Sequence, residues 1–138
     1  MKELGLDWLS RKLRHISKPP VYYIEDSDQS GFYINPQRGV YEYKGKEFDM
    51  CNGLIIINYD DGDIASTLAH EFRHHWQWCR FGESAYENYV DYFSLTGTYE
   101  EKIKQYFNYN QIEHDALMFE VMVAPNETNL YWKNELLI

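Results

Sequence analysis

A chain of 138 residues is long enough to bury a hydrophobic core and too short for two domains, so we expect a single domain over residues 1–138. Its formal net charge of −9 argues against nucleic acid as the main partner, because binding to a phosphate backbone needs clustered lysine and arginine. No apolar stretch reaches the length of a membrane span or of a signal-peptide core, so we expect a cytoplasmic protein with no membrane partner.

The N-terminal half is predicted to contain one helix followed by a small, mostly antiparallel sheet. Apolar residues recur on one side of a helix over residues 7–16, and two prolines end that pattern. Strand-forming runs, separated by turn-rich segments, then follow at residues 21–24, 31–34, 40–43 and 53–58. The run at 53–58 leads directly into the next helix, and we expect one flank of this strand to be unpaired, so that an extended substrate can pair with it.

A second helix is predicted to begin at Ile64, with Asp63 as its N-cap. Its apolar side chains, Cys79 among them, share one side, and two histidines lie roughly opposite. Cys79 is expected on the buried side and does not form a ligand-spaced pair with Cys51. Both cysteines are therefore predicted to be free thiols in a reducing compartment.

Further helices are predicted to fill the C-terminal half. Residues 82–84 end the preceding helix and begin another over about residues 85–95. The pattern then predicts helices over residues 99–107 and 111–123, the last of which is stopped by Pro125. A helix, a small sheet, the histidine-bearing helix and then C-terminal helices make an α+β arrangement.

Residues 70–74 form a His-Glu-x-x-His motif, the spacing at which two imidazoles on one helical face can bind one zinc ion. His70 and His74 lie about 40° apart around the helix, one turn above the other. Glu71 lies about 100° from His70, where it can reach a water held by the metal and act as a general base. His75 points about 140° away from His70, so we predict a packed histidine, hydrogen-bonded to a neighbour, rather than a ligand.

A catalytic zinc ion takes three protein ligands and leaves the fourth position to water. The third ligand must come from outside the motif, and the last predicted helix carries polar candidates on an otherwise apolar segment. From the residues alone the choice stays open among Glu113, Asp115, His114 and earlier acids such as Glu100.

At this point the chain resembles the gluzincin branch of zinc metallopeptidases, in which the His-Glu-x-x-His helix is followed by a later helix with a glutamate ligand. Among short chains it resembles the minigluzincins and the phage-immunity anti-repressor peptidases. Their second motif, Glu-x-acid-Ala-x-x-Phe, is matched here by Glu113, Asp115, Ala116 and Phe119. The resemblance in the order of elements extends over about residues 1–125.

The resemblance implies a zincin-like fold in which Zn²⁺ is bound by His70, His74 and Glu113. It also implies a metallopeptidase that hydrolyses peptide bonds in a protein or peptide substrate, with Glu71 as the general base. Members of this branch stabilise the oxyanion with a tyrosine or histidine from a downstream segment. The candidates for that role here are Tyr99, Tyr106 and Tyr109.

The chain departs from the family pattern at one position. Many gluzincins place Asp or Asn four residues after the ligand glutamate, to hold a zinc-bound histidine, and this chain has Leu117 there. We therefore expect that support to come from Asp115, Glu120 or a backbone carbonyl.

Two other functions are compatible with the motif. One is a non-catalytic zincin-fold protein that binds a partner and whose zinc site is structural or vestigial. The other is a SprT-type protease acting on DNA-associated proteins, which uses a third histidine and usually a basic surface. His114 is the only downstream histidine and the net charge is −9, so this second alternative is disfavoured. The sequence makes no prediction about the oligomeric state.

Overall fold

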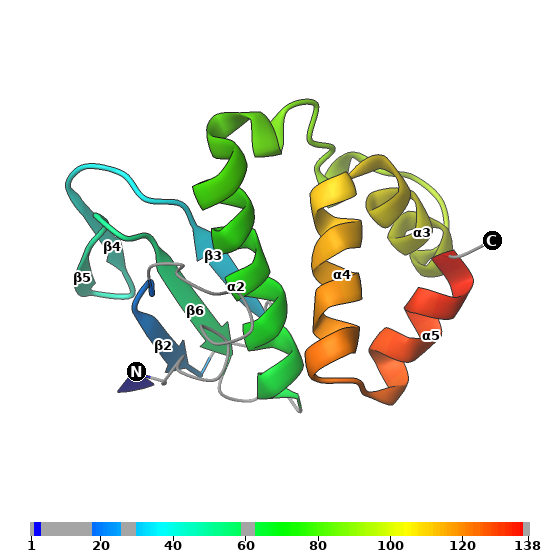
Figure 1. The fold of residues 1–138 in the computed structure, drawn as a ribbon, viewed down its shortest axis with the longest axis horizontal. Coiled ribbons are helices and arrows are strands. Elements are labelled where there is room, and N and C mark those ends of the chain that lie inside the picture. The colour runs from blue at the N-terminus through cyan, green and yellow to red at the C-terminus, as the bar shows by residue number, and fades with distance from the viewer. Residues whose placement is uncertain (1, 4–17, 26–29, 59–62, 137–138) are drawn as a thin grey trace.

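The computed structural model describes residues 2–3, 18–25, 30–58 and 63–136. The helix predicted over residues 7–16 lies outside the described residues. The described part is an α+β structure, as predicted. In it, helix α2 (Ile64–Phe81) lies between a small sheet on one side and helices α3 to α5 on the other (Figure 1).

The main sheet has four strands in the order β1, β2, β6 and β3. These strands span Lys2–Glu3, Val21–Ile24, Leu54–Asn58 and Gly31–Ile34. β1 pairs antiparallel with β2, and β3 pairs antiparallel with β6, but the central pair of β2 and β6 is parallel. The sheet is therefore small, as predicted, and mixed: two of its three pairings are antiparallel, and the central one is parallel.

Strand β6 is central in this sheet, so the prediction that one of its flanks is unpaired is wrong. It pairs with β2 on one side and with β3 on the other. The physical reason is its uninterrupted apolar run: Leu54 to Ile57 are each at most 1% exposed, and a strand buried on both faces suits the middle of a sheet. The edge strand beside α2 is β3, which has a strand partner on one side only among the described residues.

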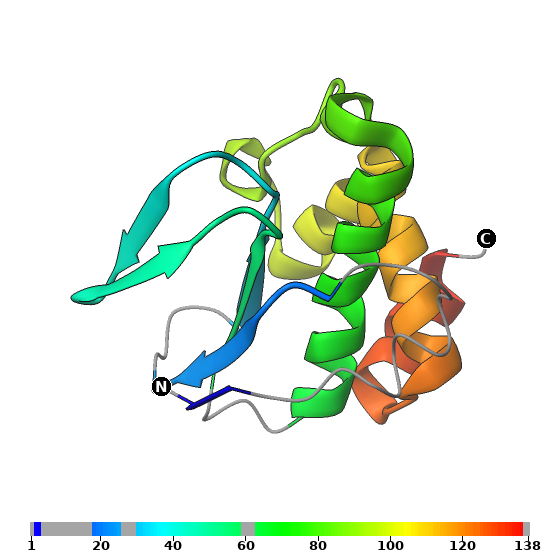
Figure 2. The same cartoon turned by 60° about the vertical axis from the view of Figure 1, so that its left-hand side comes forward.

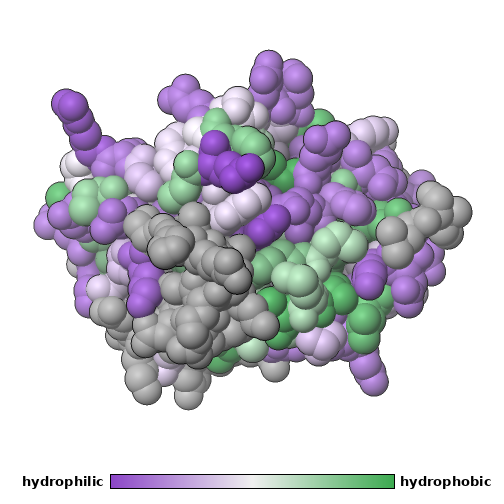
Figure 3. Space-filling view, viewed as in Figure 1, coloured by the Kyte–Doolittle hydropathy of each residue, from purple (hydrophilic) through white to green (hydrophobic). Residues whose placement is uncertain are grey.

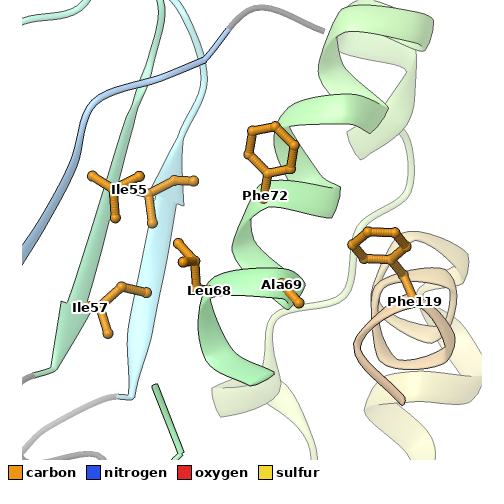
Figure 4. Packing of buried hydrophobic residues seen from close by; sticks show 7 residues of the cluster. Ile55, Ile57, Leu68, Ala69, Phe72 and Phe119 are labelled. Carbon is orange, nitrogen blue, oxygen red and sulfur yellow. The ribbon is translucent and has the colours of Figure 1, made fainter. Parts of the chain in front are cut away.

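Hydrophobic side chains pack on both faces of β6. On one face, Ile55 and Ile57 belong to a hydrophobic cluster with three residues of α2 and one of α4, labelled in Figure 4: Leu68, Ala69, Phe72 and Phe119. This cluster joins the sheet to the two helices that carry the predicted site. It therefore sets the distance between β3, α2 and α4.

Side chains from a second, two-stranded sheet and the residues after it pack on the other face of β6. Its strands β4 (Val40–Tyr43) and β5 (Lys46–Asp49) form a hairpin that extends away from the helices (Figure 2). Phe48 and the following Met50 pack on this face of β6. The strand at 40–43 is predicted correctly, whereas β5 was not predicted, because only Phe48 in it is buried.

Three α-helices form the C-terminal part of the chain: α3 (Tyr99–Tyr109), α4 (Gln111–Val123) and α5 (Glu127–Leu136). The helices predicted over 99–107 and 111–123 are confirmed to within two residues. α5 was not predicted. Pro125 lies between α4 and α5, where it separates two helices rather than ending the helical region.

The α-helix predicted over residues 85–95 is wrong. This segment contains two short 3₁₀ turns, η1 (Gly82–Tyr86) and η2 (Tyr92–Ser94), joined by irregular chain. Asn88 between them has a φ of 60°, a left-handed conformation through which an α-helix cannot continue. The segment therefore runs as a loop from the end of α2 to the start of α3.

The start of α2 is confirmed, but one of its residues was misplaced. Asp63 caps the helix by accepting a hydrogen bond of 3.2 Å from the backbone N–H of Ser66. Cys79 is exposed, so its placement on the buried side is wrong. The reason is that the C-terminal end of α2 extends beyond β3 and β6, so that no strand in the described part of the chain covers it (Figure 1).

The character of the helices and of the surface bears on the expectation that the chain has no membrane partner. No helix in the described part of the chain combines the length and the apolar character that crossing a membrane requires. The face seen in Figure 3 is mostly hydrophilic, with a hydrophobic area over α4 and α5. The exposed large hydrophobic residues of these two helices are Met122, Leu130 and Tyr131.

We expect Phe72→Ala to lower the free energy of unfolding by about 3–5 kcal/mol, because its ring is fully buried between the sheet and α4 and its removal leaves a cavity. The matched control is Phe93→Ala. The Phe93 ring is 91% exposed, so a change below about 0.5 kcal/mol is expected. Denaturant unfolding measures both, and equal effects would contradict the core assignment.

Candidate metal centre

The two histidines of the motif lie on the side of α2 that faces α4, opposite Glu113 in the first turn of α4. The Nε2 atoms of His70 and His74 lie 2.9 and 3.0 Å from the same carboxylate oxygen, Oε1 of Glu113. All three donor atoms lie within 4.8 Å of one another. The structure therefore brings together the three side chains that the sequence singled out as ligands.

The other candidate ligands do not join this group among the described residues. Asp115 forms an ion pair with Arg73, in which Nε of Arg73 lies 2.7 Å from the carboxylate. Glu100 is exposed and accepts a hydrogen bond from Tyr131. His114 follows Glu113 directly but contributes no donor atom to the cluster.

The donor set suits a tetrahedral metal ion. At metal–ligand distances of about 2.0–2.1 Å, tetrahedral donors lie roughly 3.3 Å apart. The two separations of 2.9 and 3.0 Å fall a few tenths of an ångström short of that value, so a small opening of the cluster would admit the ion. Two imidazoles and one glutamate are also a donor set found in catalytic zinc sites.

His70 is oriented by a carboxylate behind it. Its Nδ1 atom lies 2.9 Å from Oε1 of Glu120, and the other oxygen of Glu120 accepts a hydrogen bond of 2.9 Å from the amide of Asn129 in α5. Donation from Nδ1–H to Glu120 leaves the Nε2 lone pair of His70 available to a metal. Glu120 was one of the predicted supports, whereas Asn129 was not predicted.

His74 is oriented by a neutral group. Its Nδ1 atom lies 2.8 Å from Oε1 of Gln77, which follows it by three residues on α2. The amide of Gln77 donates to Asp115 at 2.9 Å, and Arg73 binds both oxygens of that carboxylate. Asp115 therefore supports His74 through Gln77 rather than directly. Gln77 was missed, although its spacing from His74 places both on one helical face.

Glu113 is held from its other side by two tyrosines. The hydroxyls of Tyr89 and Tyr106 donate to Oε2 at 2.7 and 2.8 Å and also contact each other. This arrangement leaves Oε1 directed at the histidines. Tyr99 and Tyr109, two of the tyrosines predicted to stabilise the oxyanion, are 68% and 59% exposed. Neither lines the hollow that His70, His74 and Glu113 border.

Glu71 lines the same hollow, and its carboxylate has no hydrogen bond to any residue that the structure describes. Only 8% of the residue is exposed. Burial raises the pKa of Glu71, and the nearby histidines lower it by less, so the net pKa lies above the usual value. A buried carboxylate of this kind is suited to exchanging a proton with a bound water.

The site opens into a groove with two parts. One part, of about 380 Å³, is lined by aromatic side chains from β3, η1, α3 and the loop before α3: Phe32, Tyr33, Tyr86, Tyr89, Tyr106 and Phe107. The other, of about 670 Å³, adjoins it at His70 and Glu71 and runs along the N-terminal half of α2. A bound molecule that reaches Glu71 therefore has room on both sides.

His75 is a packed residue, as predicted. It is 0% exposed, and its Nδ1 atom lies 2.7 Å from the hydroxyl of Tyr33. Since Tyr33 belongs to β3, this hydrogen bond ties the edge strand to α2 next to His74.

The three converging side chains shift one another's ionisation. Burial raises the pKa of Glu113, but the two histidines outweigh burial and hold it well below the usual 4.5. Burial lowers the pKa of His70, but hydrogen bonds to Glu113 and Glu120 outweigh burial and raise it well above 6.5. The pKa of His74 is raised as well, because the attraction of Glu113 exceeds the effect of burial. Protons therefore compete with a metal ion for these nitrogen atoms.

Comparisons of the chain with protein-family models, with curated proteins and with solved structures found no match. The zincin-like fold and the gluzincin family therefore stay predictions. What bears on function is the chemistry of the converging side chains.

We expect this cluster to stabilise the metal-free protein most between about pH 4.5 and pH 6.5. The folded-state pKa of His70 is raised, so its contribution is complete below its unfolded pKa and is lost as the pH rises through the folded pKa. The folded-state pKa of Glu113 is lowered, so its contribution is present above its unfolded pKa and is lost as the pH falls through the folded pKa.

Thermal unfolding of metal-free protein from about pH 4 to about pH 9 measures this dependence. His70→Ala is the control, and its stability should fall less above neutral pH. A wild-type stability that rises steadily from pH 6.5 to pH 9 would show that the ionisation of this cluster is described wrongly.

The supports of the two histidines yield a second prediction. Asp115→Ala and Asn129→Ala should each weaken metal affinity by about 10–100-fold, because each releases the group that orients a histidine. Competition with a chelator measures the metal affinity, under conditions in which all variants are folded to the same extent. Asn134→Ala, an exposed change on α5, is the control and should leave the affinity unchanged.

Proposed function

We propose that this chain is a zinc-dependent peptidase in which Glu71 activates water for hydrolysis of a peptide bond. The observation that carries the proposal is the position of Glu71: a buried carboxylate without a hydrogen-bond partner among the described residues, beside the donors His70, His74 and Glu113 and lining a groove. A carboxylate is rarely buried unpaired without a functional reason.

Zinc is favoured by the donor chemistry. A structural zinc site is normally closed by four protein ligands, whereas three protein donors leave one position for water or substrate. The described residues supply three converging donors, two of them imidazoles. This count supports a catalytic site over the structural or vestigial site of a non-catalytic binding protein.

The roles of the residues follow from this arrangement. When bound, zinc lowers the pKa of a water molecule and polarises the scissile carbonyl. Glu71 accepts the proton of the attacking water and later passes it to the leaving amine, and its raised pKa brings it closer to the pH at which both transfers are efficient. Glu120 and Gln77 keep the two imidazoles in the orientation that this chemistry requires.

Tyr86 is the residue we assign to the oxyanion. It lines the hollow at the site, and its hydroxyl has no hydrogen bond to the described residues, whereas Tyr106 is already engaged with Glu113. Burial raises the pKa of Tyr86, and the charges of Glu71 and Glu113 raise it further, so the phenol keeps its proton. A protonated phenol can donate to the oxygen on which negative charge develops.

The edge strand β3 is the element we assign to substrate binding. Gly31, Phe32 and Tyr33 line the hollow together with His70 and Glu71. Because β3 is paired on one side only among the described residues, an extended peptide can add to it through main-chain hydrogen bonds. This assignment supports a peptide substrate and replaces the docking on β6 expected from the sequence.

The test compares zinc content with hydrolysis of casein or a peptide library. Glu71→Gln should keep about one zinc per chain and lose activity by about 10²–10⁴-fold or more, because it removes the base and no ligand. His70→Ala, His74→Ala and Glu113→Ala should lose the metal itself.

Two outcomes would contradict the proposal. Full activity in Glu71→Gln would remove the mechanism. Zinc bound by the wild-type protein with no hydrolysis of any peptide, with or without a chelator, would favour the alternative of a partner-binding protein.

A further inference from the structure

The larger part of the groove has a consistent charge. It is lined by the start of β3, the N-terminal half of α2 and residues of α3, α4 and α5, and it holds about 670 Å³, enough for a long side chain and adjoining backbone. Five carboxylates lie around the site and this part of the groove: Asp63, Glu71, Glu113, Glu120 and Glu127. No lysine or arginine lines it among the described residues.

This charge is not removed by a metal. A divalent cation at the site offsets two negative charges, whereas Glu127, which lines the groove in the first turn of α5, keeps its own charge. Clefts lined by charge of one sign concentrate the field and attract a ligand of opposite sign. Glu71 itself, nine-tenths buried, unpartnered among the described residues and lining this groove, indicates that a ligand rather than the protein completes its surroundings.

Apolar residues in the lining suit the stem of a long cationic side chain. Ile103 and Phe107 of α3 and Trp132 of α5 line this larger part of the groove. The methylene stem of lysine or arginine packs on such a surface while its charged head lies at carboxylates. The ring of Trp132 adds a cation–π surface. Glu127 is exposed in the first turn of α5 and forms no ion pair with any described residue.

The direction of the substrate follows from β3. Gly31 lies against Thr67 and Tyr33 against His75, so β3 runs in the same direction as α2. A peptide that pairs antiparallel with β3, the slightly more stable of the two pairings, runs from the His75 end toward Thr67. Its C-terminal half therefore lies over the acidic groove, which Thr67 lines.

We propose that this acidic groove binds a lysine or arginine side chain on the C-terminal side of the scissile bond. The substrate class is then a peptide with a basic residue shortly after the cleavage site. The inference rests on the proposed peptidase function for the position of the bond, but the preference for a basic peptide is measurable by binding alone.

The experiment uses the full chain loaded with zinc and matched peptides that carry Lys, Gln or Glu at each of three positions on either side of the bond. Cleavage rate and binding, the latter by fluorescence anisotropy of labelled peptides, are measured separately. Lysine on the C-terminal side should raise kcat/KM and affinity by about tenfold over glutamate, and the difference should shrink as salt rises from about 0.02 M to about 0.5 M.

Glu127→Gln should reduce this preference by about threefold, and Glu127→Lys should abolish or reverse it, because Glu127 contributes charge at the groove without a structural partner among the described residues. Glu42→Gln, an equivalent loss of charge on the exposed face of β4, is the control and should leave the preference unchanged.

The outcomes separate the two proposals. Cleavage without any preference, with a preference for glutamate, or with a preference for lysine only on the N-terminal side overturns this inference and leaves the peptidase function standing. Absence of cleavage, together with salt-sensitive binding of basic peptides that Glu127→Lys removes, overturns the peptidase function and supports the basic ligand. Equal binding of all peptides with no cleavage overturns both.

Discussion

The buried carboxylate of Glu113 is the constraint on which the helical half of the molecule depends. Burying a charge is expensive unless it is paired and hydrogen-bonded. Glu113 meets this requirement with four partners from three segments: two histidines of α2, Tyr106 of α3 and Tyr89 of the loop before it. Each partner fixes the position of its own segment, so the packing of α2, α3 and α4 and the convergence of the metal donors are one structural arrangement.

The two histidines are supported by different chemistry. His70 faces the anion of Glu120, which α5 holds through Asn129, whereas His74 faces the neutral amide of Gln77, which Asp115 holds. An anionic partner makes the imidazole a stronger donor to a metal than a neutral one does. The C-terminal helix, which contributes no ligand, thereby participates in the site.

The sheet contributes no candidate metal ligand among the described residues, but it positions the edge strand β3 beside α2. Because β6 is buried on both faces and takes the centre, β3 is left at the edge beside α2, and the hydrogen bond between Tyr33 and His75 holds it there. The same edge borders Glu71 and the acidic groove. The free edge that β3 has among the described residues, a buried carboxylate and an acidic groove therefore lie next to one another, which supports the proposed binding of an extended peptide.

Sequence periodicity by itself determined the local geometry of the His-Glu-x-x-His motif and the helices over residues 99–107 and 111–123. The spacing of His70, Glu71 and His74 determines their relative directions on any α-helix, and the helix predicted over residues 111–123 places Glu113 in its first turn. Tertiary structure alone decided the order of strands, which moved the free edge from β6 to β3, and the long-range supports Tyr89 and Asn129. The physical reason is that the geometry inside a helix or strand repeats from residue to residue. Strand pairing and side-chain burial depend instead on which segments, distant in sequence, exclude water from one another.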